Sequence, residues 1–155
     1  MQSYQEYFIP IFVSNLLAIV LMLLSYHFPR VLRVIWGAVF IIAGIINLIT
    51  VYNNPLIYIE GFGPTAIPFY QEIIYGPFSE YPGFYITLIS IGQIIIGGMI
   101  WSKKFWFILG CLGAVIFLLA IVPLGVGSAF PSTVFMALAI IFLMRKKRKR
   151  SIFGT

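Results

Sequence analysis

The chain has 155 residues, of which 61% are hydrophobic and only 9% are charged, and it carries a net charge of +6. A soluble domain has about a quarter of charged residues, so this composition excludes a water-soluble globular protein and indicates a protein solvated by a bilayer. The positive charge does not indicate nucleic-acid binding, because six of the ten basic residues form one run directly after a hydrophobic segment, as is typical of a cytoplasmic membrane flank.

Five hydrophobic segments follow one another along the chain and predict five transmembrane helices. The expected spans are, approximately, residues 7–26, 31–52, 84–101, 105–122 and 132–144. Small residues such as Gly37, Gly44 and Gly97 recur within them and predict close packing between helices. No basic region or small-residue cleavage site precedes Pro10, so we expect the first segment to stay in the mature protein.

Residues 53–83 form the one long break between these segments, and we expect an ordered outer loop there. The loop holds three of the four acidic residues and no Lys or Arg, and it is too aromatic for a disordered linker. A short amphipathic helix is predicted over Thr65–Tyr75, lying on the outer leaflet or capping the bundle. Thr65 would be its N-cap, Pro68 would lie in its first turn, and Gly76-Pro77 would end it.

The distribution of basic residues predicts the orientation, since Lys and Arg prefer the cytoplasmic side of a membrane. With the basic tail 145–155 inside, five alternating spans place all ten basic residues inside or at the inner interface. The N-terminus and the 53–83 loop, with all four acidic residues, then lie outside. A four-span arrangement, or a re-entrant fifth segment, would turn basic residues outward. The sequence therefore predicts an all-α integral membrane protein of one domain, a five-helix bundle in a bacterial cytoplasmic membrane.

The run of basic residues after the last span is expected to anchor this orientation and to contact anionic lipids, at about 1 kcal/mol for each basic residue near the surface. Its members are Arg145, Lys146, Lys147, Arg148, Lys149 and Arg150. Membrane lipids are therefore expected partners.

Neutral amides within the spans are the candidate binding residues. Asn15, Asn47 and Gln93 lie in the first three spans, where they could meet in the outer half of the bundle. One interpretation is hydrogen bonding between helices, at about 0.6 kcal/mol per bond. The other is a pocket for a lipid or quinone-like ligand, roofed by the loop helix, to which Tyr70 and Glu72 would contribute. No charged residue lies mid-membrane, which disfavours pumps and ion-coupled carriers.

The sequence does not form a catalytic or metal-binding constellation. His27 is the only histidine and Cys111 the only cysteine, so a disulfide within the chain and a metal site built on several such ligands are excluded. His27 would lie inside while every acid lies outside, which excludes a Ser-His-acid triad. We therefore expect no catalytic residue, metal or cofactor, and favour a non-enzymatic role.

The second segment reads RVIWGAVFIIAGIIN from Arg33 to Asn47, and Gln93 precedes Gly97-Gly98 in the third. This pattern resembles the DoxX-like family of small membrane proteins over about residues 31–144. Asn47 and Gln93 stand where that family tends to carry Lys and Glu, so two amides replace a charged pair. The resemblance implies an accessory subunit of a membrane oxidoreductase or a helper of export or maturation.

The function expected from these features is that of a small integral-membrane subunit or accessory protein. It would bind another membrane or extracytoplasmic protein through its outer loop and helix faces. Two alternatives remain open. One is a binder or carrier of a lipid or quinone-like ligand, and the other is a subunit of a DoxX-like membrane oxidoreductase.

Overall fold

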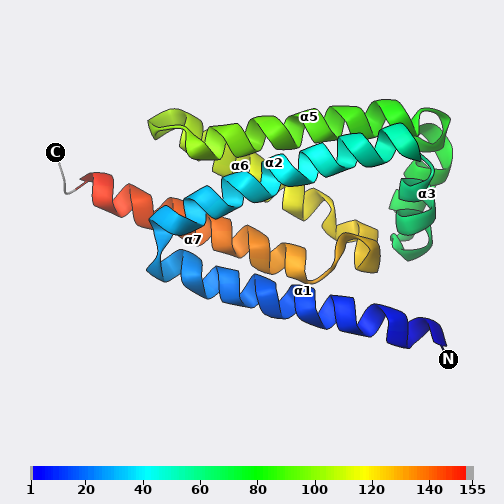
Figure 1. Cartoon of the computed structure of the whole chain (residues 1–155), viewed down its shortest axis with the longest axis horizontal. Helices are drawn as coiled ribbons and strands as arrows, with labels where there is room; N and C mark the ends of the chain where they lie inside the picture. Colours follow the sequence, from blue (N-terminus) through cyan, green and yellow to red (C-terminus); the bar gives the residue numbers. More distant parts are fainter. Residues whose placement is uncertain (1, 153–155) are drawn as a thin grey trace.

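The computed structural model describes the backbone of residues 2–152 and the side chains of residues 12–145, and this part of the chain is helical with no strand. Its long helices are α1 (Gln2–His27), α2 (Pro29–Asn53), α5 (Pro82–Trp101), α6 (Lys104–Ala120) and α7 (Ser132–Ile152). Consecutive long helices run in opposite directions (Figure 1). Short helices lie at one end, namely α3 (Ile57–Phe62), η1 (Gly63–Thr65), α4 (Pro68–Ile73), η2 (Ile74–Phe78) and η3 (Val122–Ser128). The all-α prediction is confirmed for the described residues.

Prolines determine where several of these helices begin. Pro29, Pro68 and Pro82 are the first residues of α2, α4 and α5. At this position the missing N–H would have no partner inside the helix anyway, and the fixed backbone angle of proline suits helix entry. This is why α5 begins two residues before the expected span at residue 84, and why Pro68 lies in the first turn of α4 as predicted.

The closest packing between long helices is that of α2 on α5. A Cβ atom built on Gly44 would lie 2.6 Å from the carbonyl oxygen of Ser90, and one built on Gly97 would lie 2.6 Å from that of Gly37. No hydrophobic force draws helices together in lipid, so close backbone approach at small residues is what holds such a pair. The small residues singled out in the sequence therefore mark the faces by which these two helices meet.

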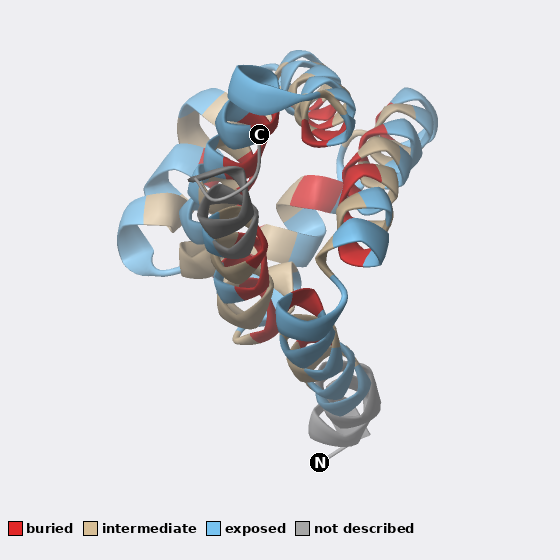
Figure 2. Cartoon of the chain, turned by 90° about the vertical axis from the view of Figure 1, so that its left-hand side faces the viewer, coloured by how far each residue is buried: buried red, intermediate tan, exposed pale blue. Residues whose placement is uncertain are grey.

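The other long helices extend this pair into a bundle. Helix α5 packs on α6, α6 on α7, and α7 on α1, whereas α1 contacts α2 only sparsely. Helices α1 and α2 diverge from their connecting turn (Figure 1), where the indole N–H of the buried Trp36 donates a hydrogen bond to Ser25 Oγ at 3.2 Å. Buried residues lie on the sides of the helices that face the interior of the bundle (Figure 2). The main cluster includes Leu32, Phe40, Ile100, Phe107, Ala114, Ile140 and Leu143.

Only some of the helices meet the length and hydropathy that a membrane span requires. Helices α2 and α5 do so, and α6 with η3 would form a third span, although the two are bent by 78° from each other. The apolar parts of α1 and α7 within the described residues, Phe12–His27 and Ser132–Arg145, are shorter. The structure thus supports two or three spans by length, where the sequence predicted five.

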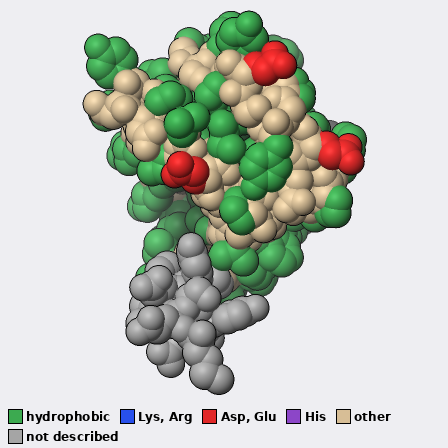
Figure 3. Space-filling model, turned by 90° about the vertical axis from the view of Figure 1, so that its right-hand side faces the viewer, with side chains coloured by type: hydrophobic (Ala, Val, Ile, Leu, Met, Phe, Trp, Pro, Cys, Tyr) green, Lys and Arg blue, Asp and Glu red, His purple; other side chains and the backbone are tan. Residues whose placement is uncertain are grey.

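Charged side chains are segregated between the two ends of the molecule. The end with the short helices, here called the acidic end, carries Glu60, Glu72 and Glu80, all exposed. Figure 3 shows this end with acidic and no basic side chains among the described residues. The opposite end, the basic end, holds the α1–α2 turn, the α5–α6 turn and the end of α7 (Figure 1). Its described basic side chains include His27, Arg30, Lys103, Lys104 and Arg145.

The loop between α2 and α5 is ordered, but its construction differs from the prediction. Residues 54–81, here called the cap, contain α3, which was not predicted, and α4 spans only Pro68–Ile73 of the expected Thr65–Tyr75 helix. Ile67, not Thr65, occupies the N-cap position, without a side-chain hydrogen bond. The helical path continues as the π-helical η2 and breaks at Gly76, whose backbone angles are φ −95° and ψ −116°.

Apolar side chains in and next to α4 differ in burial. Ile74, just after α4, is buried and Tyr70 is half-buried, whereas Ile67, just before α4, is 48% exposed. Ile67 precedes the helix with an extended backbone, and its N–H donates a hydrogen bond to the carbonyl of Pro123 at 2.9 Å. Contact with η3 therefore sets the direction of its side chain, and the helical spacing does not.

Candidate functional site

The amides of Asn47 and Gln93 meet directly where α2 packs on α5. Asn47 Nδ2 donates a hydrogen bond to Gln93 Oε1 at 2.8 Å. Gln93 is buried and Asn47 is half-buried. Gly44 lies one turn before Asn47, and its missing side chain lets the two backbones approach closely enough for the short amide to reach across.

A third polar side chain completes this contact from the cap. The hydroxyl of Tyr58, in α3, donates a hydrogen bond to Asn47 Oδ1 at 3.0 Å and lies 3.3 Å from the Asn47 carbonyl oxygen. Burial raises the pKa of Tyr58 above its ordinary value, with a weaker opposing effect from a hydrogen bond with Thr50. The phenol therefore stays protonated at neutral pH and acts as a donor. We call Asn47, Gln93 and Tyr58 the polar triad.

The polar triad links three elements, and both the oxygen and the nitrogen of the Asn47 side-chain amide form hydrogen bonds within it. The amide oxygen of Asn47 accepts from Tyr58, and its nitrogen donates to Gln93. Such contacts stabilise the packing of α2, α5 and α3 on one another, which is the first of the two interpretations of these amides. They contain no group that titrates near neutral pH and no nucleophile, so they suit a structural junction.

The other predicted site residues lie in different surroundings. The hydroxyl of Tyr70 donates a hydrogen bond to the carbonyl of Ala120 at 2.9 Å, at the end of α6. Glu72 is exposed on the surface of the cap. Asn15 is half-buried on α1, the helix that packs chiefly against α7. The structure thus brings together two of the predicted residues, Asn47 and Gln93, and adds Tyr58, which sequence reasoning did not select.

A second set of contacts fastens the cap to η3. Thr65 Oγ1 donates a hydrogen bond to the carbonyl of Leu124 at 2.8 Å and accepts one from the N–H of Gly127 at 3.2 Å. Gly125 has a φ of +68°, and a Cβ atom there would collide with the carbonyl oxygen of Thr65. Glycine is therefore required at residue 125 both for its backbone conformation and for the close approach of the cap.

Beyond these two attachments, the rest of the cap presents apolar side chains to its surroundings. Phe69 is 64% exposed, Tyr75 is 55% exposed and Tyr81 is 65% exposed. Hydrophobic side chains lie next to the exposed acidic ones on this face (Figure 3). The cap is thus held on both sides of the bundle while its outward surface combines aromatic rings with carboxylates.

The basic end has a hollow of its own, at the turn between α1 and α2. It measures about 300 Å³ and is lined by five consecutive residues, His27–Val31. Arg145 is exposed at the same end of the molecule. The side chains of the rest of the predicted basic anchor, Lys146, Lys147, Arg148, Lys149 and Arg150, lie outside the described residues.

Among residues 12–145, no group of three or more His, Cys, Asp or Glu side chains is placed to hold a metal ion.

Comparison with family models, with curated proteins and with solved structures gave no match to this chain. The resemblance of residues 31–144 to the DoxX-like family therefore stays a prediction.

Proposed function

We propose that this protein is a small integral-membrane accessory protein that binds a partner protein, itself membrane-bound or extracytoplasmic, through the cap at its acidic end. All five long helices would lie in the membrane, with the cap outside and the basic end in the cytoplasm. The cell membrane of a bacterium is the setting that these features suit. Binding would involve no catalytic step by this chain.

The observation that carries the proposal is a fixed surface with unburied apolar groups. The polar triad holds the cap to α2 and α5, and Thr65, Ile67 and Tyr70 hold it to η3 and α6. A cap held in this way loses little conformational entropy when it binds. Its exposed aromatic side chains are of the kind that carry most of the energy at protein interfaces.

The orientation is supported by the segregation of charge. Basic side chains favour the cytoplasmic side, and in this molecule they gather at the end opposite to the cap. The helices α2 and α5, which are long and apolar enough to cross, connect the two ends. The cap would therefore meet partners on the outer side.

The ligand-binding alternative has less support from the geometry. A pocket with Asn47 and Gln93 as its polar lining needs their amides to be available to a ligand. These amides instead form hydrogen bonds with each other, and that of Asn47 also bonds to Tyr58. A DoxX-like oxidoreductase subunit is a narrower form of the accessory role, and the identity of the captured partner would distinguish it.

A photo-crosslinking amino acid at residue 69 tests the proposal in native membranes. Phe69 is 64% exposed on the cap, and Phe105, which is 67% exposed at the basic end, provides a matched control position. We expect a discrete protein adduct from residue 69 that is absent from residue 105, with mass spectrometry to identify it. The same adducts from both positions, or lipid adducts alone from residue 69, would contradict the proposal.

A further inference from the structure

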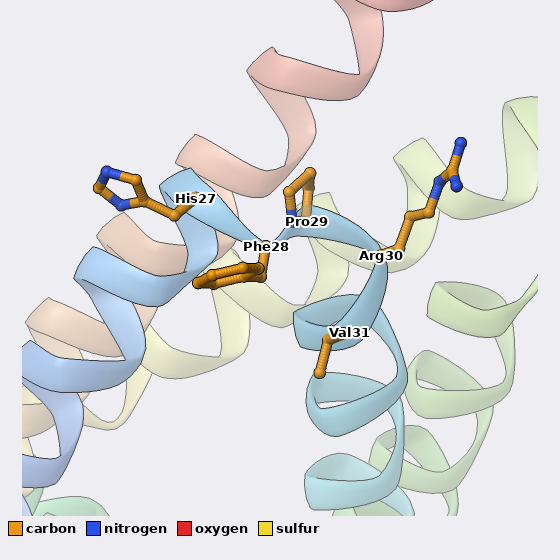
Figure 4. A pocket seen from close by; sticks show the side chains of 5 residues that line it. All are labelled: His27, Phe28, Pro29, Arg30 and Val31. Atoms are coloured by element: carbon orange, nitrogen blue, oxygen red, sulfur yellow. The ribbon is translucent and has the colours of Figure 1, made fainter.

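The hollow between α1 and α2 combines the guanidinium of Arg30 with exposed apolar side chains. His27 and Arg30 extend to opposite sides of the turn, with Phe28 and Val31 between them (Figure 4). Phe28 is 58% exposed and Val31 is 57% exposed. The turn therefore presents a cationic group, the guanidinium of Arg30, next to an apolar surface, which is the pattern that an amphipathic anion would match.

Arg30 is available for binding, in contrast to the neighbouring Arg33. Arg33 Nε donates a hydrogen bond to the carbonyl of Ile100 at 2.7 Å, and its guanidinium lies 4.7 Å from the centre of the Phe107 ring. Within the described part of the chain, no hydrogen bond or ion pair holds the guanidinium of Arg30, which is exposed. Its five donors can therefore serve a ligand from outside the chain.

No carboxylate of α1 or α2 in the range of residues 7 to 59 competes with a ligand for Arg30, because no acidic residue occurs there. The imidazole of His27 extends to the other side of the turn (Figure 4), and its Nδ1 donates a hydrogen bond to the carbonyl of Leu23 at 3.0 Å. Among the five residues that line the hollow, Arg30 is therefore the one placed to hold an anion.

We infer that this hollow binds the headgroup of an anionic phospholipid, with its phosphate on the guanidinium of Arg30. The guanidinium group suits phosphate because its planar donors form paired hydrogen bonds with two oxygens. The acyl chains would follow the exposed apolar faces of α1 and α2, which diverge from this turn (Figure 1) and carry Leu23 and Val34, 56% and 59% exposed.

The position of the hollow favours a lipid over a soluble anion. It lies at the first turn of α2, one of the helices long and apolar enough to cross a membrane, and thus at the level where headgroups are expected. Phe28 and Val31 would gain nothing from free phosphate, whereas they can contact the glycerol and upper acyl region of a lipid. The inference rests on the membrane placement proposed above, but it does not depend on a partner at the cap.

Binding can be measured on the full chain in nanodiscs of phosphatidylcholine, with and without phosphatidylglycerol. We expect phosphatidylglycerol to raise the midpoint of thermal unfolding and to be retained by the protein in native mass spectrometry. Arg30→Gln should weaken retention about tenfold, the expected effect of losing a charge-assisted pair. Lys103→Gln removes an exposed cation from the other turn of the basic end and should retain the lipid as the unchanged chain does.

Three results would overturn the inference. Equal loss in Arg30→Gln and Lys103→Gln would show a diffuse basic surface and no site. Equal protection by inorganic phosphate in phosphatidylcholine nanodiscs would exclude a lipid-specific site. Full retention in a folded Arg30→Lys variant would show that the guanidinium fork is not used. Arg30→Lys also keeps the test decisive if Arg30→Gln does not fold. Failure of the cap to capture a protein would leave the lipid result unaffected.

Discussion

At the scale of single residues, two members of the polar triad could be predicted from the sequence and the third could not. Asn47 and Gln93 could be expected to meet, because both are short polar interruptions of apolar spans on helices of opposite direction. Tyr58 could not be selected in the same way. Its contact with Asn47 depends on α3 folding back onto α2 after the turn at Asn54 and Pro55, and that turn has no periodic signal.

The polar triad predicts coupling between particular residues. In a double-mutant cycle on unfolding, Asn47→Leu and Tyr58→Phe should be non-additive by about 0.5 kcal/mol or more, because they share one hydrogen bond. Asn47→Leu and Tyr70→Phe should be additive, since Tyr70 bonds instead to the carbonyl of Ala120. Chemical unfolding of each variant in the same detergent provides the measurement. Coupling of Tyr70 but not Tyr58 to Asn47 would restore the ligand-pocket interpretation.

Two arginines that look alike in sequence have different roles. Arg30 and Arg33 were both expected to mark the cytoplasmic side between the first two spans. In the structure the guanidinium of Arg33 donates to the carbonyls of Ile100, Trp101 and Ser102, where it caps the end of α5. A spacing of three residues makes them neighbours on the first turns of α2, so the sequence did not distinguish them, and the partner of Arg33 at the end of α5 could not be read from it.

At the scale of elements, the sequence around Thr65 predicted a helix N-cap, but a tertiary contact uses the Thr65 side chain instead. Thr65 precedes Pro68 at a spacing typical of a helix start. Its hydroxyl instead bonds with η3, at Leu124 and Gly127, which are 59 and 62 residues away in the sequence. Sequence reasoning identified an ordered loop with a helix in it but could not identify the surface on which the loop docks.

The packing of α2 on α5 makes a matched pair of glycine variants informative. A Cβ atom on Gly97 would lie 2.6 Å from the backbone carbonyl oxygen of Gly37, whereas one on Gly98 would have no other atom within 4 Å. Gly97→Ala should therefore lower the free energy of unfolding by about 1–3 kcal/mol, as overpacking does. Gly98→Ala should be neutral or slightly stabilising, because alanine favours the helix. The midpoints of thermal unfolding compare them, and equal effects would contradict the packing described here.

At the scale of the whole molecule, the five predicted hydrophobic segments all lie in helices with alternating directions. The difference concerns which helices are long enough to span. Helix α6 ends at Ala120, and the chain bends by 78° into η3, because Pro123 and Gly125 interrupt the helical path. Hydropathy alone extended this segment to residue 122 and could not reveal the bend.

The distribution of charged residues supports the proposed orientation more strongly than the lengths of the helices do. The fold places Glu60, Glu72 and Glu80 at one end, and Arg30, Lys103 and Arg145 at the other. Residues far apart in the sequence thus give the molecule one acidic end and one basic end. This agreement is what the proposed orientation and the proposed role of the cap both depend on.

Cysteine accessibility on intact cells tests this central claim most directly. In a Cys111→Ser background, single cysteines would replace Glu80 in the cap, Val126 in η3, and Lys103 between α5 and α6, all of them exposed. We predict that an impermeant thiol reagent labels residues 80 and 126 on intact cells and labels residue 103 only after the membrane is opened. Labelling of residues 80 and 103 alike, or protection of residue 126 together with residue 103, would contradict the proposed topology.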